Sequence, residues 1–453
     1  MELSILFSGN SPKYVQIYEE IKQAILMKKL SAHEQLPSKR MLANTLNVSV
    51  HTIKEAYEQL LAEGYIYSKE RSGYFIASFQ FEWLQLPQKD KQAPIQPLTN
   101  TIKFDFHNGH VDKDAFPFST WHKLMKKHFN AHNLSTSPWQ GEATLRQEIA
   151  HYVERSRGVM CDASQVFVYS GTQTQLQALC HFFGQLTQVG LEEPGFKRVH
   201  ATLLQCGLPI HAIPVDNSGI TVPQTEVHML YTTPAHQFPL GMVMSMERRA
   251  QLLQWATSNE AFIIEDDYDS EFRYKGLPIP SLAKLDQLQR VIYFGTFSKI
   301  LISSLRISYM ILPQSLVEAF TVFNQEQKST VSKVDQLILA DFIEQGLFEK
   351  HLAKMRTIYR KKQLALLAAI STHFSDDFQV IGEKSGLHII LKLPQWLSED
   401  EGLRRAQVAG INVYPCSTSF LHPSKNNMVI IGYGGLSIEQ IEEGIALLAT
   451  VWQ

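Results

Sequence analysis

Four short apolar runs between residues 166 and 296 place the strongest constraint on the fold. VFVYS (166–170), HMLYTT (228–233), AFIIEDD (261–267) and VIYFGT (291–296) are each long enough for one strand, and helical stretches separate them. Near-continuous apolar runs of this length are typical of parallel strands that are buried on both faces. We therefore predict an α/β fold built on a mostly parallel sheet.

The chain from about residue 313 has a different pattern. Long helical stretches come first, and LHIILKL (387–393) and MVIIGY (428–433) then predict two further strands. This mixture suits a smaller α+β lobe beside the large sheet. The longest apolar run, LALLAAI (364–370), fits a buried helix, since a membrane span needs about 18 apolar residues.

Residues 12–77 form a separate unit at the amino end. Ser38 and Ser49 stand where N-caps are expected, so they predict the starts of a second and a third helix. Gly64 ends the third helix, and YIYS and YFIA then predict a hairpin. The expected apolar sides of the three helices are Tyr14, Ile17, Ile21 and Ile25; Leu42 and Leu46; and Ile53, Ala56, Tyr57, Leu60 and Leu61. Three helices followed by a hairpin form a winged helix-turn-helix.

The segment between these patterns is rich in Gln, Pro and Lys and has no sustained periodicity, which is typical of an extended linker. The sequence therefore predicts three parts, residues 1–79, a linker at 80–103, and residues 104–453. Hydrophobic residues make up 44% and charged residues 19%, as in globular proteins. A net charge of −2 excludes an overall basic coat for nucleic acid but allows a local basic patch.

The four cysteines lie far apart without a CxxC pair, which argues against a zinc ribbon and a disulfide scaffold. The first residues, MELSILFSGNSPKY, lack the charged and apolar regions of a signal peptide. We therefore expect a cytoplasmic protein without a membrane partner and with reduced thiols.

The starts of the second and third predicted helices combine positive charge with hydroxyl groups. Three cations and no acidic residue lie between Leu36 and Lys54. Such groups at helix N-termini can reach phosphates and base edges, and a hairpin tip can enter a minor groove. The candidate contacts to double-stranded DNA are Ser38, Lys39, Arg40, Ser49, His51, Thr52, Lys54, Arg71 and Gly73. The pattern also fits a winged helix that binds protein, in which the serines act only as caps.

Polar residues follow the ends of several predicted strands of residues 104–453. Asp266 and Tyr268 end AFIIEDD, and Lys299 follows VIYFGT, seven residues before Arg306. Ser170-Gly171-Thr172-Gln173 joins a strand to a helix whose free N–H groups favour a phosphate, and Phe196 could cover a planar ring. An amine, a carboxylate and a phosphate cradle are the groups that pyridoxal phosphate needs. A Mg²⁺ cluster at Asp266, Asp267 and Asp269 is the alternative, but it leaves Lys299 and Arg306 without a role.

The sequence resembles the MocR subfamily of GntR-type transcription regulators over nearly its whole length. These proteins join a winged helix-turn-helix to a type I aminotransferase-like domain. The amino-terminal resemblance lies in LPSKRMLANTLNVSVHTIKEAYEQLLAEGYIYSKERSGYFI. The rest lies in WQGEATLRQEIA, LEEPGF, YTTPAHQFPLG, IEDDYDSEFRY and YFGTFSKILISSLRISY.

The resemblance implies pyridoxal phosphate bound to Lys299 as a Schiff base. Asp266 would then pair with the pyridine nitrogen and Tyr268 with the phenolic oxygen, while Phe196 matches the aromatic that stacks on the ring. The phosphate would be held by Ser170, Gly171, Thr172, Gln173, Thr296, Ser298 and Arg306. The resemblance also implies that Arg198 binds an effector carboxylate and that His236 and Gln237 lie beside the ring oxygen. No metal is implied.

Three departures from the family pattern stand out. Val50 follows Ser49 where the family has arginine, which leaves the operator preference open. Ile430 stands where the family has an arginine for an α-carboxylate, so such a ligand loses its main anchor. The segment STSPWQ lacks the tyrosine that reaches the partner subunit's phosphate, and Trp139 does not replace it.

The sequence thus predicts a DNA-binding transcription regulator that senses a small amine or amino compound, or pyridoxal phosphate itself. The resemblance implies a head-to-tail homodimer. We expect a sensor with at most partial transamination. Two alternatives stay open, namely an active aminotransferase with an appended DNA-binding head, and a cofactor-free scaffold that uses the aminotransferase fold to dimerise.

Overall fold

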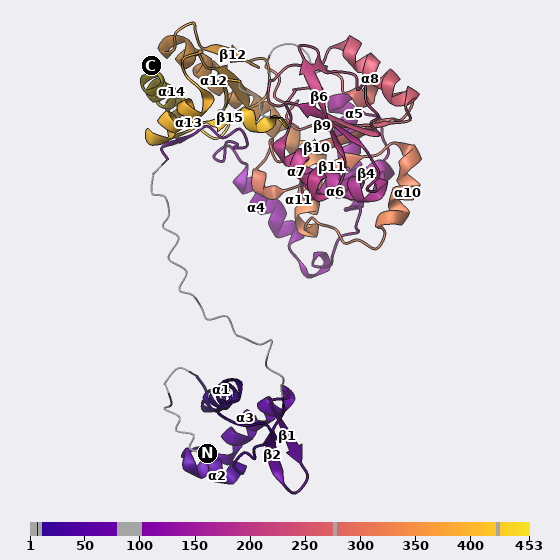
Figure 1. The fold of residues 1–453 in the computed structure, drawn as a ribbon. Helices are drawn as coiled ribbons and strands as arrows, with labels where there is room; N and C mark the ends of the chain where they lie inside the picture. The colour runs from indigo at the N-terminus through magenta and orange to yellow at the C-terminus, as the bar shows by residue number, and fades with distance from the viewer. Residues whose placement is uncertain (1–6, 8–10, 79–101, 275–278, 423–425) are drawn as a thin grey trace. The chain divides into compact units, whose positions relative to one another are not determined.

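The computed structural model describes residues 7, 11–78, 102–274, 279–422 and 426–453 (Figure 1). The chain divides into two compact units, residues 1–98 and 99–453. Most of the predicted linker lies outside the described residues, so that assignment stays a prediction. At its carboxyl end, the Lys103 backbone N–H already donates to the Gly410 carbonyl at 2.7 Å.

The amino-terminal unit is a winged helix-turn-helix. Its elements are α1 (Lys13–Leu26), α2 (Lys39–Thr45), α3 (Val50–Ala62), β1 (Ile66–Lys69) and β2 (Gly73–Ile76). Both predicted N-caps are confirmed, because the Ser38 and Ser49 hydroxyls accept hydrogen bonds from the third residue beyond each. The strands pair antiparallel, with Ile66 opposite Ile76.

The core of this unit is formed by one face of each helix. Ile17, Ile21, Ile53, Ala56, Tyr57 and Leu60 are fully buried. Two predicted core positions are wrong, since Tyr14 is 36% exposed and Leu61 is 38% exposed. Tyr18 is buried in α1 instead, and its hydroxyl donates to Glu63 just after α3. The helical stripe of α1 is therefore rotated toward Tyr18, which anchors α1 to the end of α3.

The second unit contains an eight-stranded sheet with the order β4-β11-β10-β9-β8-β5-β6-β7. The four apolar runs are confirmed as strands and form its centre and one edge. They are β4 (Val166–Tyr169), β8 (Met229–Thr232), β9 (Phe262–Asp267) and β10 (Val291–Thr296). The remaining strands are β5 (Val189–Glu193), β6 (Ile210–Asp216), β7 (Gly219–Ile220) and β11 (Ser308–Ile311). Only β11 and β7 pair antiparallel with their neighbours, so the sheet is mostly parallel as predicted.

Helices cover both faces of this sheet. Alternate residues of its strands therefore belong to two different hydrophobic cores, one on each face. Phe167, Ile292 and Phe294 pack with α6 (Thr172–Phe183), α7 (Lys197–Gln205) and α10 (Gln314–Asn324). Val168 and Tyr293 belong to a second core with α4 (Phe118–His128), α5 (Ala143–Arg157) and α11 (Lys333–Glu344). A smaller cluster includes α8 (Met246–Ser258) and α9 (Leu282–Leu285).

The small lobe is an α+β layer, as predicted. Its four-stranded sheet has the order β12-β13-β16-β15, and LHIILKL and MVIIGY are confirmed as β13 and β16. The strands are β12 (Gln379–Ile381), β13 (His388–Lys392), β15 (Tyr414–Pro415) and β16 (Met428–Gly432), and a separate pair joins β3 (Phe104–Asp105) to β14 (Ile411–Asn412). The helices are α12 (Leu347–His373), α13 (Glu399–Val408) and α14 (Ile438–Trp452).

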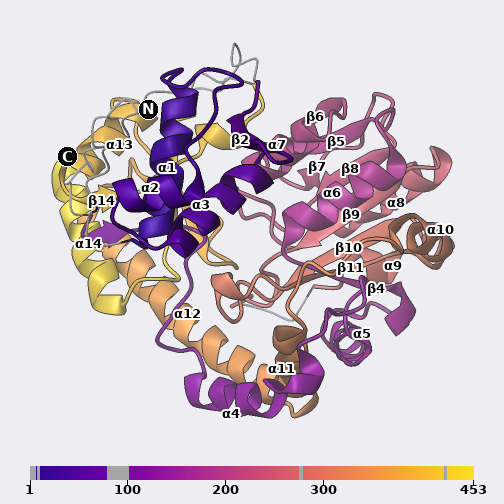
Figure 2. The same ribbon diagram turned by 90° about the horizontal axis from the view of Figure 1, so that it is seen from below.

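Helix α12 connects the two lobes. It packs along α14 in the small lobe and contacts α11 in the large one (Figure 2). LALLAAI lies in this helix, with Leu366 fully buried and Leu364 55% exposed. None of the described helices is long and apolar enough to cross a membrane.

Candidate functional site

A cavity of about 420 Å³ opens at the carboxyl ends of β4, β9 and β10. The strand register explains its position, since Asp266 of β9 lies opposite Phe294 of β10, and Thr296 lies opposite Ser308 of β11. The end of each strand therefore delivers polar residues to one edge of the sheet. Eleven of the predicted site residues line this cavity: Gly171, Thr172, Gln173, Phe196, Arg198, Asp266, Tyr268, Thr296, Ser298, Lys299 and Arg306.

Lys299 follows β10 and places its amine in the cavity. Its Nζ donates a hydrogen bond to the Asn108 carbonyl at 2.7 Å. Burial lowers the pKa of Lys299 to about 8, with a raising contribution from Asp269 and a lowering one from Arg198. A lysine amine of this kind loses its proton near neutral pH more easily than an exposed one and can then act as a nucleophile.

Asp266 is a buried carboxylate with one unused oxygen. The Tyr231 hydroxyl donates to its Oδ2, whereas Oδ1 has no hydrogen-bond partner among the described residues. Burial raises the pKa of Asp266 to about 7, against the lowering effect of the Tyr231 hydrogen bond. A buried acceptor at a cavity wall is stabilised by a cationic donor, such as a protonated ring nitrogen.

The start of α6 and Arg306 form an anion-binding corner of the cavity. Gly171 precedes α6 with φ of +109°, and a side chain here would collide with the Arg306 guanidinium. Arg306 donates to the Ser170 carbonyl at 3.2 Å. The Gly171 N–H is taken by the Ser308 hydroxyl at 2.9 Å, while the first amides within α6 have no acceptor in the helix itself. This corner therefore suits a phosphate.

Aromatic rings form another wall. Phe196 stacks on Phe238 with ring centroids 3.9 Å apart, and Tyr268 meets Phe196 edge-on at 5.1 Å. Gln237 does not reach the cavity, because its amide donates to the Pro194 carbonyl at 2.8 Å and the Phe238 carbonyl at 2.6 Å. Phe238 thus lines the cavity in place of Gln237.

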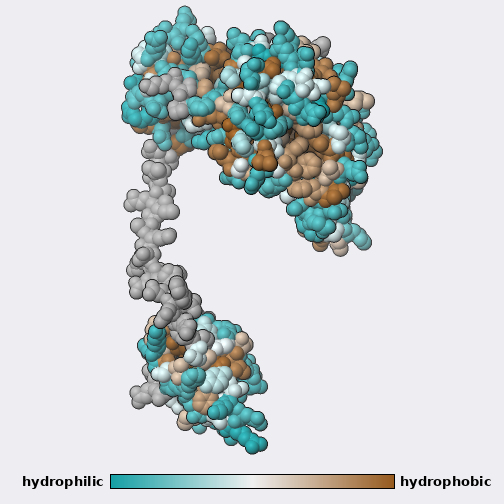
Figure 3. Space-filling view, turned by 45° about the vertical axis from the view of Figure 1, so that its right-hand side comes forward, coloured by the Kyte–Doolittle hydropathy of each residue, from teal (hydrophilic) through white to brown (hydrophobic). Residues whose placement is uncertain are grey.

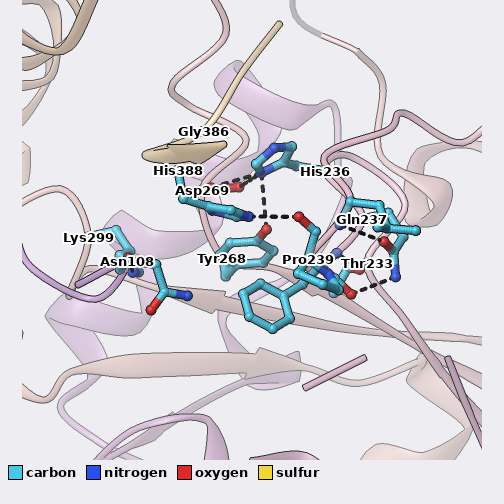
Figure 4. Close-up of polar contacts among 12 residues, drawn as sticks. Asn108, Thr233, His236, Gln237, Pro239, Tyr268, Asp269, Lys299, Gly386 and His388 are labelled. Carbon is cyan, nitrogen blue, oxygen red and sulfur yellow. Dashed lines mark hydrogen bonds and ion pairs between the residues drawn. The ribbon is translucent and has the colours of Figure 1, made fainter. Parts of the chain in front are cut away.

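His236 and Ser170 also do not line the cavity. His236 lies behind Tyr268, with its Nδ1 3.0 Å from the phenol oxygen (Figure 4). Ser170 contributes its backbone carbonyl to Arg306 and its N–H to Thr330. Both residues therefore act through neighbours that do line the cavity.

The three carboxylates of the magnesium alternative have separate partners. Asp267 accepts from Arg157 and from Tyr293, each at 2.6 Å, and Asp269 faces His236 at 3.0 Å. Only Asp266 of the three lines the cavity. This arrangement argues against a common cation and leaves the cavity to Lys299 and Asp266.

Several cavity residues were missed in the sequence. His107 and Asn108 come from the segment after β3, and Tyr414 and His388 come from the small lobe. These segments lack a strand-end pattern that would connect them with Lys299. Ile430, the departure from the family pattern on β16, lines the cavity and is 4% exposed.

The candidate DNA contacts lie at the starts of α2 and α3 and in the hairpin turn. Arg40, His51 and Lys54 are exposed, although Lys54 pairs with Glu58 at 3.6 Å. Lys39 is partly engaged within the unit, since its amine donates to the Tyr74 hydroxyl at 3.2 Å and lies over that ring.

The remaining candidates serve caps and the turn. The Ser38 and Ser49 hydroxyls accept from backbone N–H groups, and Ser49 also contacts the Thr52 hydroxyl at 2.8 Å. Arg71, in the exposed turn between β1 and β2, has a φ of +61°, and Gly73, the exposed first residue of β2, has a φ of +103°. Val50, the departure at the start of α3, is 46% exposed.

Comparison with known proteins gives the same two-part division. Residues 13–76 match the family of bacterial regulatory proteins of the gntR family, and residues 101–445 match aminotransferase class I and II. Among solved structures, the kynurenine aminotransferase of Pyrococcus horikoshii has a TM-score of 0.71 and is 24% identical, covering 78% of this chain and 91% of that one. This likeness shows the fold.

Full-length relatives are transcription regulators. The uncharacterized HTH-type transcriptional regulator YhdI of Bacillus subtilis is 43% identical over 453 residues, which cover 98% of this chain and 96% of the relative. The probable rhizopine catabolism regulatory protein MocR of Rhizobium meliloti is 34% identical, covering 97% of this chain and 94% of the relative. The chain therefore belongs to the MocR subfamily of GntR-type, DNA-binding transcription regulators, in which a winged helix-turn-helix precedes an aminotransferase class I and II domain.

Proposed function

We propose that this regulator carries pyridoxal phosphate on Lys299 and uses it to sense a small amine or amino compound, or pyridoxal phosphate itself. The observation that carries this proposal concerns Oδ1 of Asp266, which has no hydrogen-bond partner in the described part of the chain and is buried in the wall of the cavity that also holds the Lys299 amine. A pyridinium N–H is a donor of the required charge for that oxygen.

The other residues of the cavity support the same ligand. Gly171, Thr172 and Gln173 at the start of α6, together with Thr296, Ser298 and Arg306, would hold the phosphate. Phe196 would cover the ring, and the Tyr268 hydroxyl would bond the ring oxygen. When bound, pyridoxal phosphate supplies an aldehyde that can transfer between Lys299 and an incoming primary amine.

The cavity wall that contains Ile430 limits which chemical groups an effector can carry. Ile430 belongs to an apolar cluster with Phe238, Tyr268 and Cys416, so this wall offers no cation to an α-carboxylate. Arg198 lies exposed at the cavity, and it lowers the pKa of Lys299, which places its charge near the amine. An ordinary α-amino acid therefore lacks an anchor on the Ile430 wall, and Arg198 would be left to bind any carboxylate that the effector carries.

The proposal includes a homodimer that binds a DNA operator in the cytoplasm. Helix α4 and the segment after it expose large apolar side chains, with Phe118 at 55%, Phe129 at 67% and Leu134 at 65% exposure. Figure 3 shows brown hydrophobic surface among the teal of the second unit. Exposed apolar side chains of this size support burial against a second copy, head to tail as the resemblance implies.

The central test is labelling of the purified protein. We expect pyridoxal phosphate to produce a visible absorbance band, and borohydride to fix the label on Lys299, as read by peptide mass spectrometry. Lys299→Ala should abolish both signals, with Lys284→Ala, which replaces an exposed lysine outside the cavity, as the control. A protein that gains no absorbance would be a cofactor-free scaffold. Steady turnover of an amino donor and a keto acceptor would identify an aminotransferase instead.

A further inference from the structure

A buried cluster of polar side chains lies next to Tyr268 (Figure 4). His236 follows β8, Asp269 follows β9, and His388 begins β13 of the small lobe. The side chains of His236 and Asp269 are 1% and 2% exposed. Neither of these two residues lines the cavity, so direct contact with a ligand does not explain why they are buried together.

The geometry of the cluster centres on one nitrogen. His236 Nδ1 lies 3.0 Å from both carboxylate oxygens of Asp269 and 3.0 Å from the Tyr268 hydroxyl oxygen. Gly386 packs against this point, where a Cβ would lie 2.6 Å from Nδ1 and 2.8 Å from Asp269 Oδ2. The imidazole and the carboxylate are thus held in place by backbone that leaves no room for a side chain.

The hydrogen-bond partners determine where the proton of His236 lies. His236 Nε2 is buried and has no partner among the described residues. A proton on Nε2 would therefore lack an acceptor, and the Nδ1 lone pair would then face the Asp269 carboxylate. A proton on Nδ1 avoids both costs, because Asp269 accepts it. The favoured tautomer therefore carries its proton on Nδ1.

This tautomer also determines what the Tyr268 hydroxyl can do. A protonated Nδ1 has no lone pair, so the Tyr268 hydroxyl cannot donate to it and can only accept. His388 stays neutral, because burial lowers its pKa to about 3, and its Nε2 bonds the Pro239 carbonyl at 3.0 Å. The proton of Tyr268 is consequently left to point into the cavity that this residue lines.

We propose that His236 and Asp269 are positioning residues that direct the hydroxyl proton of Tyr268 into the cavity, toward an acceptor oxygen of the ligand. Identifying that acceptor as the phenolic oxygen of pyridoxal phosphate rests on the proposed function. Asp269 holds the proton on His236 Nδ1, and His236 in turn prevents Tyr268 from donating backward into the protein. Neither residue touches the ligand itself.

A double-mutant cycle on pyridoxal phosphate affinity tests this role. Asp269→Asn removes the anionic acceptor that holds the proton on His236 Nδ1, so Nδ1 can accept a hydrogen bond from the Tyr268 hydroxyl. The dissociation constant for pyridoxal phosphate should then rise roughly ten-fold or more, as for loss of one charge-assisted hydrogen bond. In a Tyr268→Phe background the same substitution should change the affinity less than about two-fold. Equal losses in both backgrounds would show a merely structural role and overturn the proposal.

A matched control separates the loss of a buried charge from the loss of the orientation of the Tyr268 hydroxyl. Glu265 is a fully buried carboxylate on β9 that accepts from the backbone N–H groups of Leu282 and Ala283 instead of contacting Tyr268. Glu265→Gln should therefore show no coupling to Tyr268→Phe. If Asp269→Asn does not fold, His236→Asn enters the same cycle with the same expectation.

A second measurement on cofactor-free protein keeps the inference separate from the proposed function. Nitrogen NMR of histidine-labelled full-length protein, assigned with His236→Asn, should show a protonated Nδ1 and an unprotonated Nε2 on His236. The opposite tautomer would overturn the proposal whether or not pyridoxal phosphate binds. Failure of the wild-type protein to bind pyridoxal phosphate would refute the proposed function, whereas the NMR result would still decide the tautomer.

Discussion

Replacement of Asp266 by asparagine keeps the shape of the side chain and removes a buried charge from the cavity wall. Asp266 is 4% exposed, and burial raises its pKa from 3.8 to about 7 in the folded protein. Because the folded pKa lies above the unfolded one, the folded state binds the proton more tightly. The stability contributed by this group is therefore present at low pH and is lost as pH rises toward about 7.

The size of the effect follows from the pKa difference. Each pH unit between the two pKa values changes the free energy of unfolding by about 1.4 kcal/mol. Between pH 5 and pH 7, Asp266 alone should therefore cost the cofactor-free wild type about 2 kcal/mol, because the slope levels off near the folded pKa, and little more by pH 8. Asp266→Asn has no such cost, so its stability relative to wild type should rise by that amount over this range.

Urea unfolding of both cofactor-free proteins at pH 5 and pH 8 provides the measurement. Other buried acids with raised pKa values, Glu265 and Glu271, are present in both proteins and cancel in the difference. Equal pH dependence of wild type and Asp266→Asn would refute the reasoning. Asp266→Asn should also weaken pyridoxal phosphate binding and shift its absorbance, and unchanged affinity would move the role of ring partner to another residue.

Four further predictions concern DNA binding, the effector and the core. Arg40→Ala should weaken binding to all DNA sequences and reduce the salt slope by about 1, measured by fluorescence anisotropy across salt concentrations; a loss confined to one sequence would instead show that Arg40 reads bases. Because Val50 is exposed at the start of α3, we expect it to contact a thymine methyl group, so deoxyuridine in place of thymidine should weaken wild-type binding but not that of Val50→Ala. Wild type should respond weakly to α-amino acids in spectral titrations, whereas Ile430→Arg should gain a response; a micromolar wild-type response would contradict this. Leu60→Ala should lower the free energy of unfolding of the amino-terminal unit by about 2–5 kcal/mol, and Leu61→Ala, at 38% exposure, should change it by less than about 0.5 kcal/mol.

Much of the fold is encoded in local patterns that sequence reasoning can detect. The caps at Ser38 and Ser49 follow from side-chain hydroxyls near free N–H groups, and such contacts span only three residues. The central strands follow from unbroken apolar runs. Asp266 and Lys299 could be assigned to one site because the carboxyl ends of neighbouring parallel strands meet at one edge of a sheet.

Short or irregular segments gave no such signal. Strand β11 has four residues and runs antiparallel between β10 and β4, so neither its length nor its direction follows from the βα alternation. Tyr14 and Leu61 have apolar side chains at helical spacing but lie outside the buried stripe, because the docking of α1 on α3 sets the rotation of each helix.

The sequence by itself determined the two-part architecture, the large sheet and the chemistry-bearing residues at its strand ends. Only the tertiary structure decided that Phe238, not Gln237, faces the cavity, and that Asn108 and His388 border Lys299. The direction of a side chain in a loop depends on how the loop packs, and contacts between distant segments depend on how the lobes pack. Sequence periodicity indicates local secondary structure and does not predict that packing. The His236–Asp269 pair behind Tyr268 emerged for the same reason, because the segment of His236 must fold against the segment of Tyr268 and Asp269, with Gly386 of a third segment packed beside them, before one nitrogen meets both oxygen partners.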